Sequence, residues 1–146
     1  MAATVITLAI IVVAVGCAKD EPKPARKSDP IARELNRAKD VGVAMERAIA
    51  AAKEAEAGGT TFCERAYLGL VRAAQVLKTE RPDIVAPPPQ EAQFMDACGI
   101  LPAPAQECLV MTYAVDHVDD CRKITDALPA PQRESIESAM RSGTSL

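Results

Sequence analysis

Residues 98–121 read CGILPAPAQECLVMTYAVDHVDDC, and this stretch holds three of the four cysteines that follow residue 17. The fourth of these cysteines, Cys63, lies upstream. In a small exported domain, an even number of cysteines predicts a framework of disulfides. The first residues of the chain, described below, indicate export. We therefore expect two disulfides.

The helical pattern around these cysteines limits which of them can pair. Apolar residues recur at helical spacing and predict one helix from about Pro104 to Thr125; they are Leu109, Val110, Tyr113, Ala114, Val118, Cys121 and Ile124. In a straight helix the Cα atoms of Cys108 and Cys121 would lie about 20 Å apart. A disulfide needs a Cα–Cα distance below about 7 Å. Pairing Cys108 with Cys121 would therefore require a break in this helix.

We expect Cys98 to pair with Cys108, because a short turn joins the ends of their two helices into a hairpin. Cys63 then pairs with Cys121, which makes their helices antiparallel. Pairing Cys63 with Cys108 and Cys98 with Cys121 remains an alternative. The four cysteines are separated by 34, 9 and 12 residues. Zinc sites usually contain much closer pairs, so we expect no metal at these cysteines.

The longest predicted helix lies upstream of Cys63. Asp29 and Pro30 form a typical helix start, and Gly58 and Gly59 a stop. Between them, an apolar stripe recurs at alternating spacings of four and three residues: Ile31, Leu35, Ala38, Gly42, Met45, Ile49 and Ala52. We expect this stripe to pack within the domain, and a coiled-coil partner is the alternative.

Further helices are predicted on both sides of the cysteine-rich stretch. Thr61 and Glu64 have the spacing of a capping box and begin a helix that ends before Arg81. Shorter helices are expected over 90–98 and 131–141, and the motif Leu-Pro-Ala-Pro precedes a helix twice, at 101–104 and 128–131. We expect an all-α domain of four to five short helices, spanning residues 31–146 and joined by disulfides.

The beginning of the chain has a different composition. Residues 1–16 are apolar and carry no ionisable side chain, as in a secretory signal peptide. The quartet Ala14-Val15-Gly16-Cys17 resembles the lipobox of bacterial lipoproteins. This resemblance implies cleavage before Cys17, lipidation of that cysteine with palmitate among its acyl chains, and an exported protein anchored to the cell-envelope membrane through the lipid. Ala18 in place of Asp favours the outer membrane or its periplasmic face.

Two other processing routes remain open for the beginning of the chain. The apolar segment could stay attached as an uncleaved membrane anchor, or it could be removed from a simply secreted protein. After Cys17, residues 18–30 mix charges with prolines, which predicts a flexible tether. All three routes place the domain outside the cytoplasm.

The sequence contains few groups that could perform chemistry. His117 is the only histidine, and Asp120 shares its predicted helical face. A small-ligand or metal-binding site near His117 is one hypothesis, but two ligands are too few for a specific site. No nucleophile motif and no cofactor motif occurs. With 17 basic and 20 acidic residues, the chain does not favour a nucleic-acid partner.

The function that we expect is a cell-envelope lipoprotein that is not an enzyme and has no cofactor. It would act as an interaction or structural module on the membrane, with a protein partner that the sequence does not identify.

Overall fold

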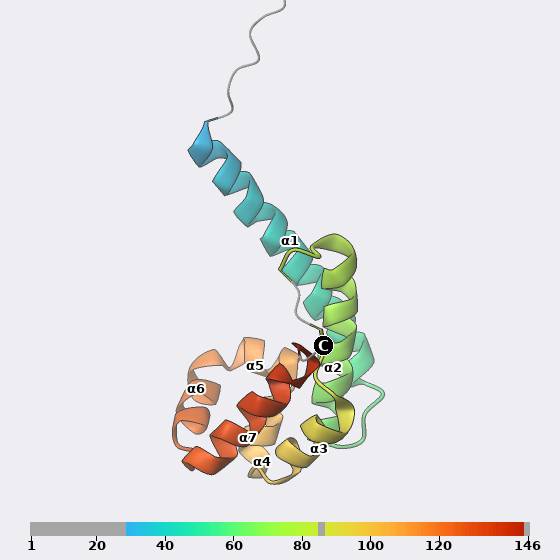
Figure 1. The fold of residues 1–146 in the computed structure, drawn as a ribbon, viewed down its shortest axis with the longest axis vertical. Coiled ribbons are helices and arrows are strands. Elements are labelled where there is room, and N and C mark those ends of the chain that lie inside the picture. Colours follow the sequence, from blue (N-terminus) through green and yellow to red (C-terminus); the bar gives the residue numbers. More distant parts are fainter. Residues whose placement is uncertain (1–28, 85–86, 145–146) are drawn as a thin grey trace, which may run out of the picture.

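A computed structural model describes residues 29–84 and 87–144 of the chain (Figure 1). Within these ranges the fold is all-α, as the sequence predicts, and contains no strand. It has seven α-helices instead of four to five, followed by a short 3-10 helix: α1 (Pro30–Glu56), α2 (Phe62–Glu80), α3 (Glu91–Gly99), α4 (Ala103–Glu107), α5 (Met111–Asp116), α6 (Val118–Asp126), α7 (Ala130–Arg141) and η1 (Ser142–Thr144).

Local capping chemistry fixes where the first two helices begin. The Asp29 side chain accepts a hydrogen bond from the Ile31 amide at 3.1 Å. At the start of α2, Thr61 and Glu64 form the predicted capping box, in which each side chain bonds the other residue's amide. The hydroxyl of Thr60 also donates to the Glu64 carboxylate, and this bond lowers the pKa of Glu64.

α1 and α2 pack along each other through small side chains. The buried positions of α1 recur every fourth residue, at Ala44, Ala48 and Ala52. Ala73 of α2 forms one buried cluster with Ala48 and Ala52. Because alanine adds little bulk, the two helices can approach closely. The apolar stripe expected to face the core is rotated away from this contact, so the predicted packing of the stripe is wrong for most of its length.

The main core lies between α2, α3, α4 and α7. Phe94, Val110 and Cys98 are its largest fully buried side chains. Leu101 and Leu128, the leucines of the two Leu-Pro-Ala-Pro motifs, are also buried in it. Each motif places its second proline in the first turn of a helix, as predicted.

The single helix expected over 104–125 is broken into α4, α5 and α6. The first break ends at Val110, whose ψ of 115° is extended and whose side chain is fully buried. The second break is at His117, with φ −128° and ψ 37°. Tertiary burial of Val110 explains the first break. The extended backbone at this residue directs its side chain into the core, whereas in a continuous helix the side chain would point elsewhere.

α3 and α7 run antiparallel along one side of the body. The side chain of Gln132, near the start of α7, donates to the Ile100 carbonyl after α3. At the other end, the Ser142 hydroxyl accepts a hydrogen bond from the Gln90 amide at 3.1 Å. Gly143 lies so close to the chain before α3 that an added Cβ would be 2.2 Å from the Pro88 carbonyl oxygen. This glycine therefore permits the contact between the two segments.

Candidate functional site

The four cysteines form two disulfides, but their pairing differs from the expected one. Cys63 bonds Cys98, with Cα atoms 5.8 Å apart, and Cys108 bonds Cys121, with Cα atoms 5.3 Å apart. The predicted pairs, Cys98–Cys108 and Cys63–Cys121, are therefore wrong. The reason is the broken helix, because the breaks at Val110 and His117 turn the chain back and bring Cys121 to Cys108.

Each disulfide joins elements in a different part of the fold. The bond from Cys63 to Cys98 fixes the first turn of α2 to the last turn of α3, within the main core. The bond from Cys108 to Cys121 closes a local loop that contains α5, a helix without a buried residue. This second bond therefore adds a covalent link to a segment that contacts the core through Val110 and the partly buried Tyr113.

His117 lies in this disulfide-closed loop and is exposed. Its ring stacks on the ring of Tyr113, with centroids 4.1 Å apart and planes inclined by 14°. Nδ1 lies 2.9 Å from the Tyr113 carbonyl oxygen, which can only accept, so Nδ1 carries the proton. Asp120 accepts a hydrogen bond from Lys123 instead of joining His117. The structure therefore does not bring together the predicted pair.

A cavity of about 340 Å³ lies beside the second disulfide, lined by Ala114, Val118, Cys121, Arg122, Thr125 and Asp126. His117 is not among these lining residues. Within residues 29–84 and 87–144, no group of three histidine, cysteine, aspartate or glutamate side chains could hold a metal ion.

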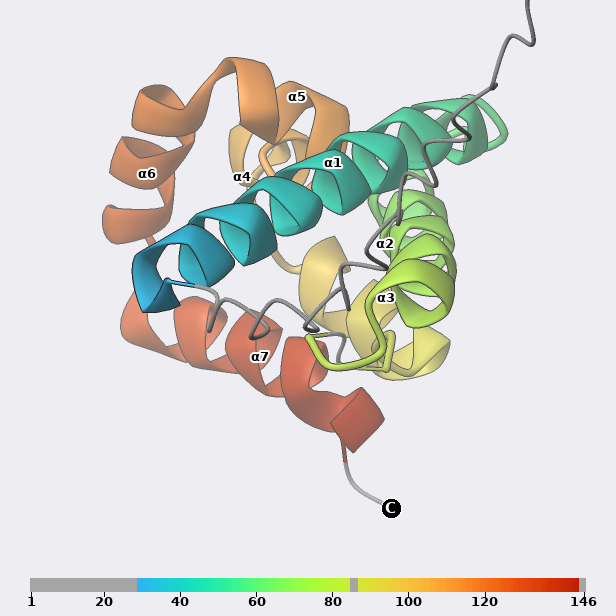
Figure 2. The same cartoon turned by 90° about the horizontal axis from the view of Figure 1, so that it is seen from above.

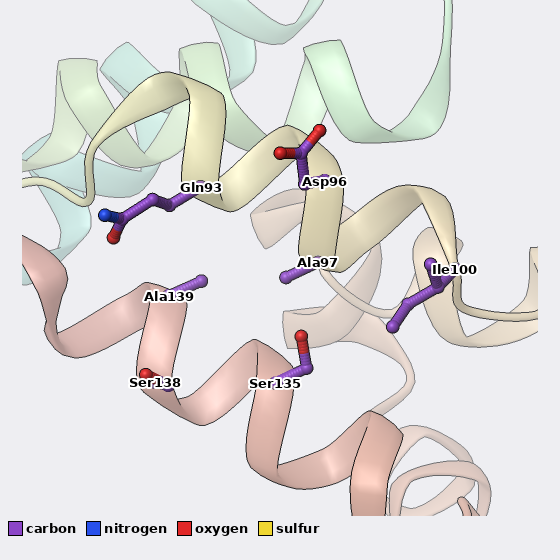
Figure 3. A pocket seen from close by; sticks show the side chains of 7 residues that line it. All are labelled: Gln93, Asp96, Ala97, Ile100, Ser135, Ser138 and Ala139. Carbon is purple, nitrogen blue, oxygen red and sulfur yellow. The ribbon is translucent and has the colours of Figure 1, made fainter.

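A larger hollow, of about 480 Å³, lies between α3 and α7. Figure 3 shows Ala97 and Ala139 pointing toward each other, the Ser135 hydroxyl pointing toward Ala97, and Asp96 pointing away from α7. Asp96 is the one charged residue among those that line it. Sequence reasoning missed this hollow, because it depends on how two separate helices pack.

The most distinctive surface belongs to the N-terminal half of α1, which projects beyond the body of the protein (Figure 1). Along residues 30–40 every residue is exposed. Three large apolar side chains of the predicted stripe lie on this projection, with exposed fractions of 69% for Ile31, 66% for Leu35 and 41% for Met45. We name the apolar face formed by Ile31, Leu35, Ala38, Gly42 and Met45 the α1 stripe.

Two exposed ion pairs join α1 to the end of α2 and to the residues that follow it. Arg37 lies 3.5 Å from the Asp83 carboxylate, and Arg47 lies 3.1 Å from the Glu80 carboxylate. Asp83 also accepts two hydrogen bonds from Arg81, and these bonds lower its pKa far below the usual value for an aspartate. Because these contacts lie on the side of α1 toward α2, they leave the α1 stripe uncovered.

The body end of α1 is fixed by a buried carboxylate. Glu56 is 2% exposed, and its carboxylate accepts hydrogen bonds from the amide and the hydroxyl of Thr112. Gly69 of α2 makes room for it, since an added Cβ there would lie 2.7 Å from Glu56 Oε1. Figure 2 shows the resulting arrangement, with α5 on one side of α1 and α2 on the other.

Replacing Glu56 by Ala should lower the free energy of unfolding by about 2 kcal/mol, because it leaves the Thr112 donors without their acceptor in a part-buried place. Urea unfolding followed by circular dichroism measures the loss. Glu54→Ala, on an exposed position of the same helix, is the control and should change stability by less than about 0.5 kcal/mol. Equal losses in both variants would contradict a stabilising role for the buried carboxylate.

Compared with known proteins, the chain matches no family model, no curated protein and no solved structure. In the described part of the chain, no helix has the length and apolar character needed to cross a membrane. Cys17 and the tether up to residue 28 lie outside the described residues. Among the described residues, the α1 stripe is the best-supported candidate surface.

Proposed function

We propose that this protein is a lipoprotein of the bacterial cell envelope that acts as a non-enzymatic interaction module. The observation that carries the proposal is the projecting half of α1, which presents the α1 stripe to its surroundings. Contiguous exposed apolar surface is typical of a binding site, because leaving it in contact with water costs free energy. A module built in this way binds with its projecting helix and does no chemistry.

The place of α1 in the chain also supports the proposal. The helix begins at Pro30, only 13 residues after Cys17. A lipid on Cys17 would hold the projecting half of α1 near the membrane surface. The disulfide-bonded body of the domain would lie farther from the membrane. Two disulfides suit an exported domain, since such bonds persist in oxidising compartments.

Replacing Cys17 by Ser is expected to release the protein from membranes or to leave an uncleaved precursor, because only that thiol would carry the lipid. Membrane fractionation and the intact mass of the protein before and after reduction measure anchoring, processing and the disulfides together. Ala18→Ser is the matched control, which keeps the cysteine and should stay with the membrane. An unchanged mature mass and unchanged membrane partitioning of Cys17→Ser would overturn the lipid anchor.

A further inference from the structure

We infer that the α1 stripe binds the α1 stripe of a second copy of this chain, with the two helices parallel. This inference rests on the proposed function, because it names the partner of the same surface. Within one chain the stripe stays exposed along the projection, while α1 packs against α2 through another face. The surface is therefore available for a partner.

The spacing of the stripe matches the core of a short coiled coil. Ile31, Leu35, Ala38, Gly42 and Met45 alternate in steps of four and three, as core positions a and d do. The small residues in the middle allow two helix backbones to approach closely. A Cβ added at Gly42 would meet nothing within 4 Å, so this space is open in the single chain.

The contact can extend only over the projecting half of α1. Farther along the helix, Met111 of the α5 segment packs against the cluster of Ala48 and Ala52. This leaves about two heptads, from Ile31 to Met45, for the contact between two copies.

The charges beside the stripe select the parallel orientation. Glu34 and Lys39 flank the core positions, at g and e. In a parallel pair, a g residue faces the e residue five positions later in the partner helix. Glu34 of each copy would then face Lys39 of the other copy, giving two attractive contacts. Antiparallel packing of the same core would instead place the two Lys39 side chains together.

The same charges argue against a lipid surface as the occupant. Residues 29–47 contain four basic and four acidic side chains, so their net charge is zero. Two of the basic residues are already in ion pairs, Arg37 with Asp83 after α2 and Arg47 with Glu80 at the end of α2. Helices that lie on anionic membranes usually carry an excess of basic residues on their polar face. A second copy therefore suits this helix better.

Anchoring to a membrane would strengthen the association of two chains through such a short contact. Two heptads with small central residues are too short for a stable dimer in dilute solution. Lipid anchors would confine both copies to one surface, which raises their effective concentration. Anchors at the N-terminal end of each chain would also start both α1 helices from the same surface, and this agrees with the parallel orientation.

The test uses the full chain purified from membranes and reconstituted in phosphatidylcholine vesicles, with donor or acceptor dyes at the C-terminus. Flotation first shows whether the protein is bound to the vesicles, and energy transfer at known surface density then measures association. Leu35→Gln should weaken association at least tenfold. Val43→Gln, an exposed position of the same helix outside the stripe, is the matched control and should change it less than twofold.

Charge exchange tests the orientation. Lys39→Glu should weaken association about fivefold, because it places like charges together. The double variant Glu34→Lys with Lys39→Glu should restore association to within twofold of the original chain. Failure of the double variant to restore it would overturn the parallel pairing.

Flotation and energy transfer together distinguish a failure of this inference from a failure of the proposed function. A chain that floats with the vesicles but shows only the energy transfer of random mixing overturns the second copy as partner and leaves the lipid anchor standing. A chain that does not float overturns the anchor itself. Unchanged association in Leu35→Gln overturns the α1 stripe as the contact surface.

Discussion

Replacing both Cys63 and Cys98 by alanine is expected to lower the free energy of unfolding by about 4 kcal/mol, because the bond closes a loop of 35 residues in the unfolded chain. This is a large share of the roughly 5–15 kcal/mol that keeps a domain of this kind folded. Urea unfolding followed by circular dichroism measures the change. The double variant is needed because a single replacement leaves a reactive thiol.

The other disulfide supplies the matched control. Its loop is only 13 residues, so replacing Cys108 and Cys121 together should cost about 3 kcal/mol on the same chain-entropy model. If removing the shorter bond destabilises the protein more than removing the longer one, loop closure does not explain the contribution of these bonds.

Phe94→Ala should destabilise the fold by about 3–5 kcal/mol, because it empties the centre of the main core. Phe94 has no exposed surface, and its ring centroid lies 5.8 Å from that of Tyr67. The neighbouring side chains include small alanines, which cannot expand to fill the space. The midpoint of thermal unfolding is the measurement.

Phe62 allows the same substitution at a less buried position. Its side chain is half-buried at the edge of the same core, so Phe62→Ala should lower the midpoint by clearly less. A loss in Phe62→Ala that equals or exceeds the loss in Phe94→Ala would contradict the position of Phe94 as the centre of the core.

The starts of the helices could be predicted from the sequence because they depend on neighbouring residues. The Asp29 cap, the capping box of Thr61 with Glu64, and the leucines before the paired prolines are all found where local chemistry placed them. Such signals act over three or four residues and need no knowledge of the tertiary fold.

The breaks at Val110 and His117 could not be predicted in the same way. Apolar periodicity across 104–125 is compatible with one helix, and the first break depends on burial of Val110 among residues distant in sequence. The wrong disulfide pairing followed directly from this difference, because a continuous helix separates Cys108 from Cys121.

The residues of the α1 stripe could be identified from the sequence, but the expectation that they pack within the domain was wrong. The α1 stripe has larger apolar side chains than the alanine face, so hydrophobicity alone favours burying the stripe. The structure instead buries Ala44, Ala48 and Ala52, which let α2 approach closely. Small size, and not apolar area, decides which face of α1 is covered within the chain.

The connectivity of the disulfides has a consequence for biosynthesis. After Cys17, the cysteines bond in consecutive pairs along the chain, the first with the second (Cys63 with Cys98) and the third with the fourth (Cys108 with Cys121). A polypeptide that crosses a membrane from its N-terminus delivers these thiols to the oxidising side in the same order. If this protein is exported as we propose, oxidation of each pair as it emerges would give the native bonds directly, and its maturation should need an oxidase but little help from a disulfide isomerase.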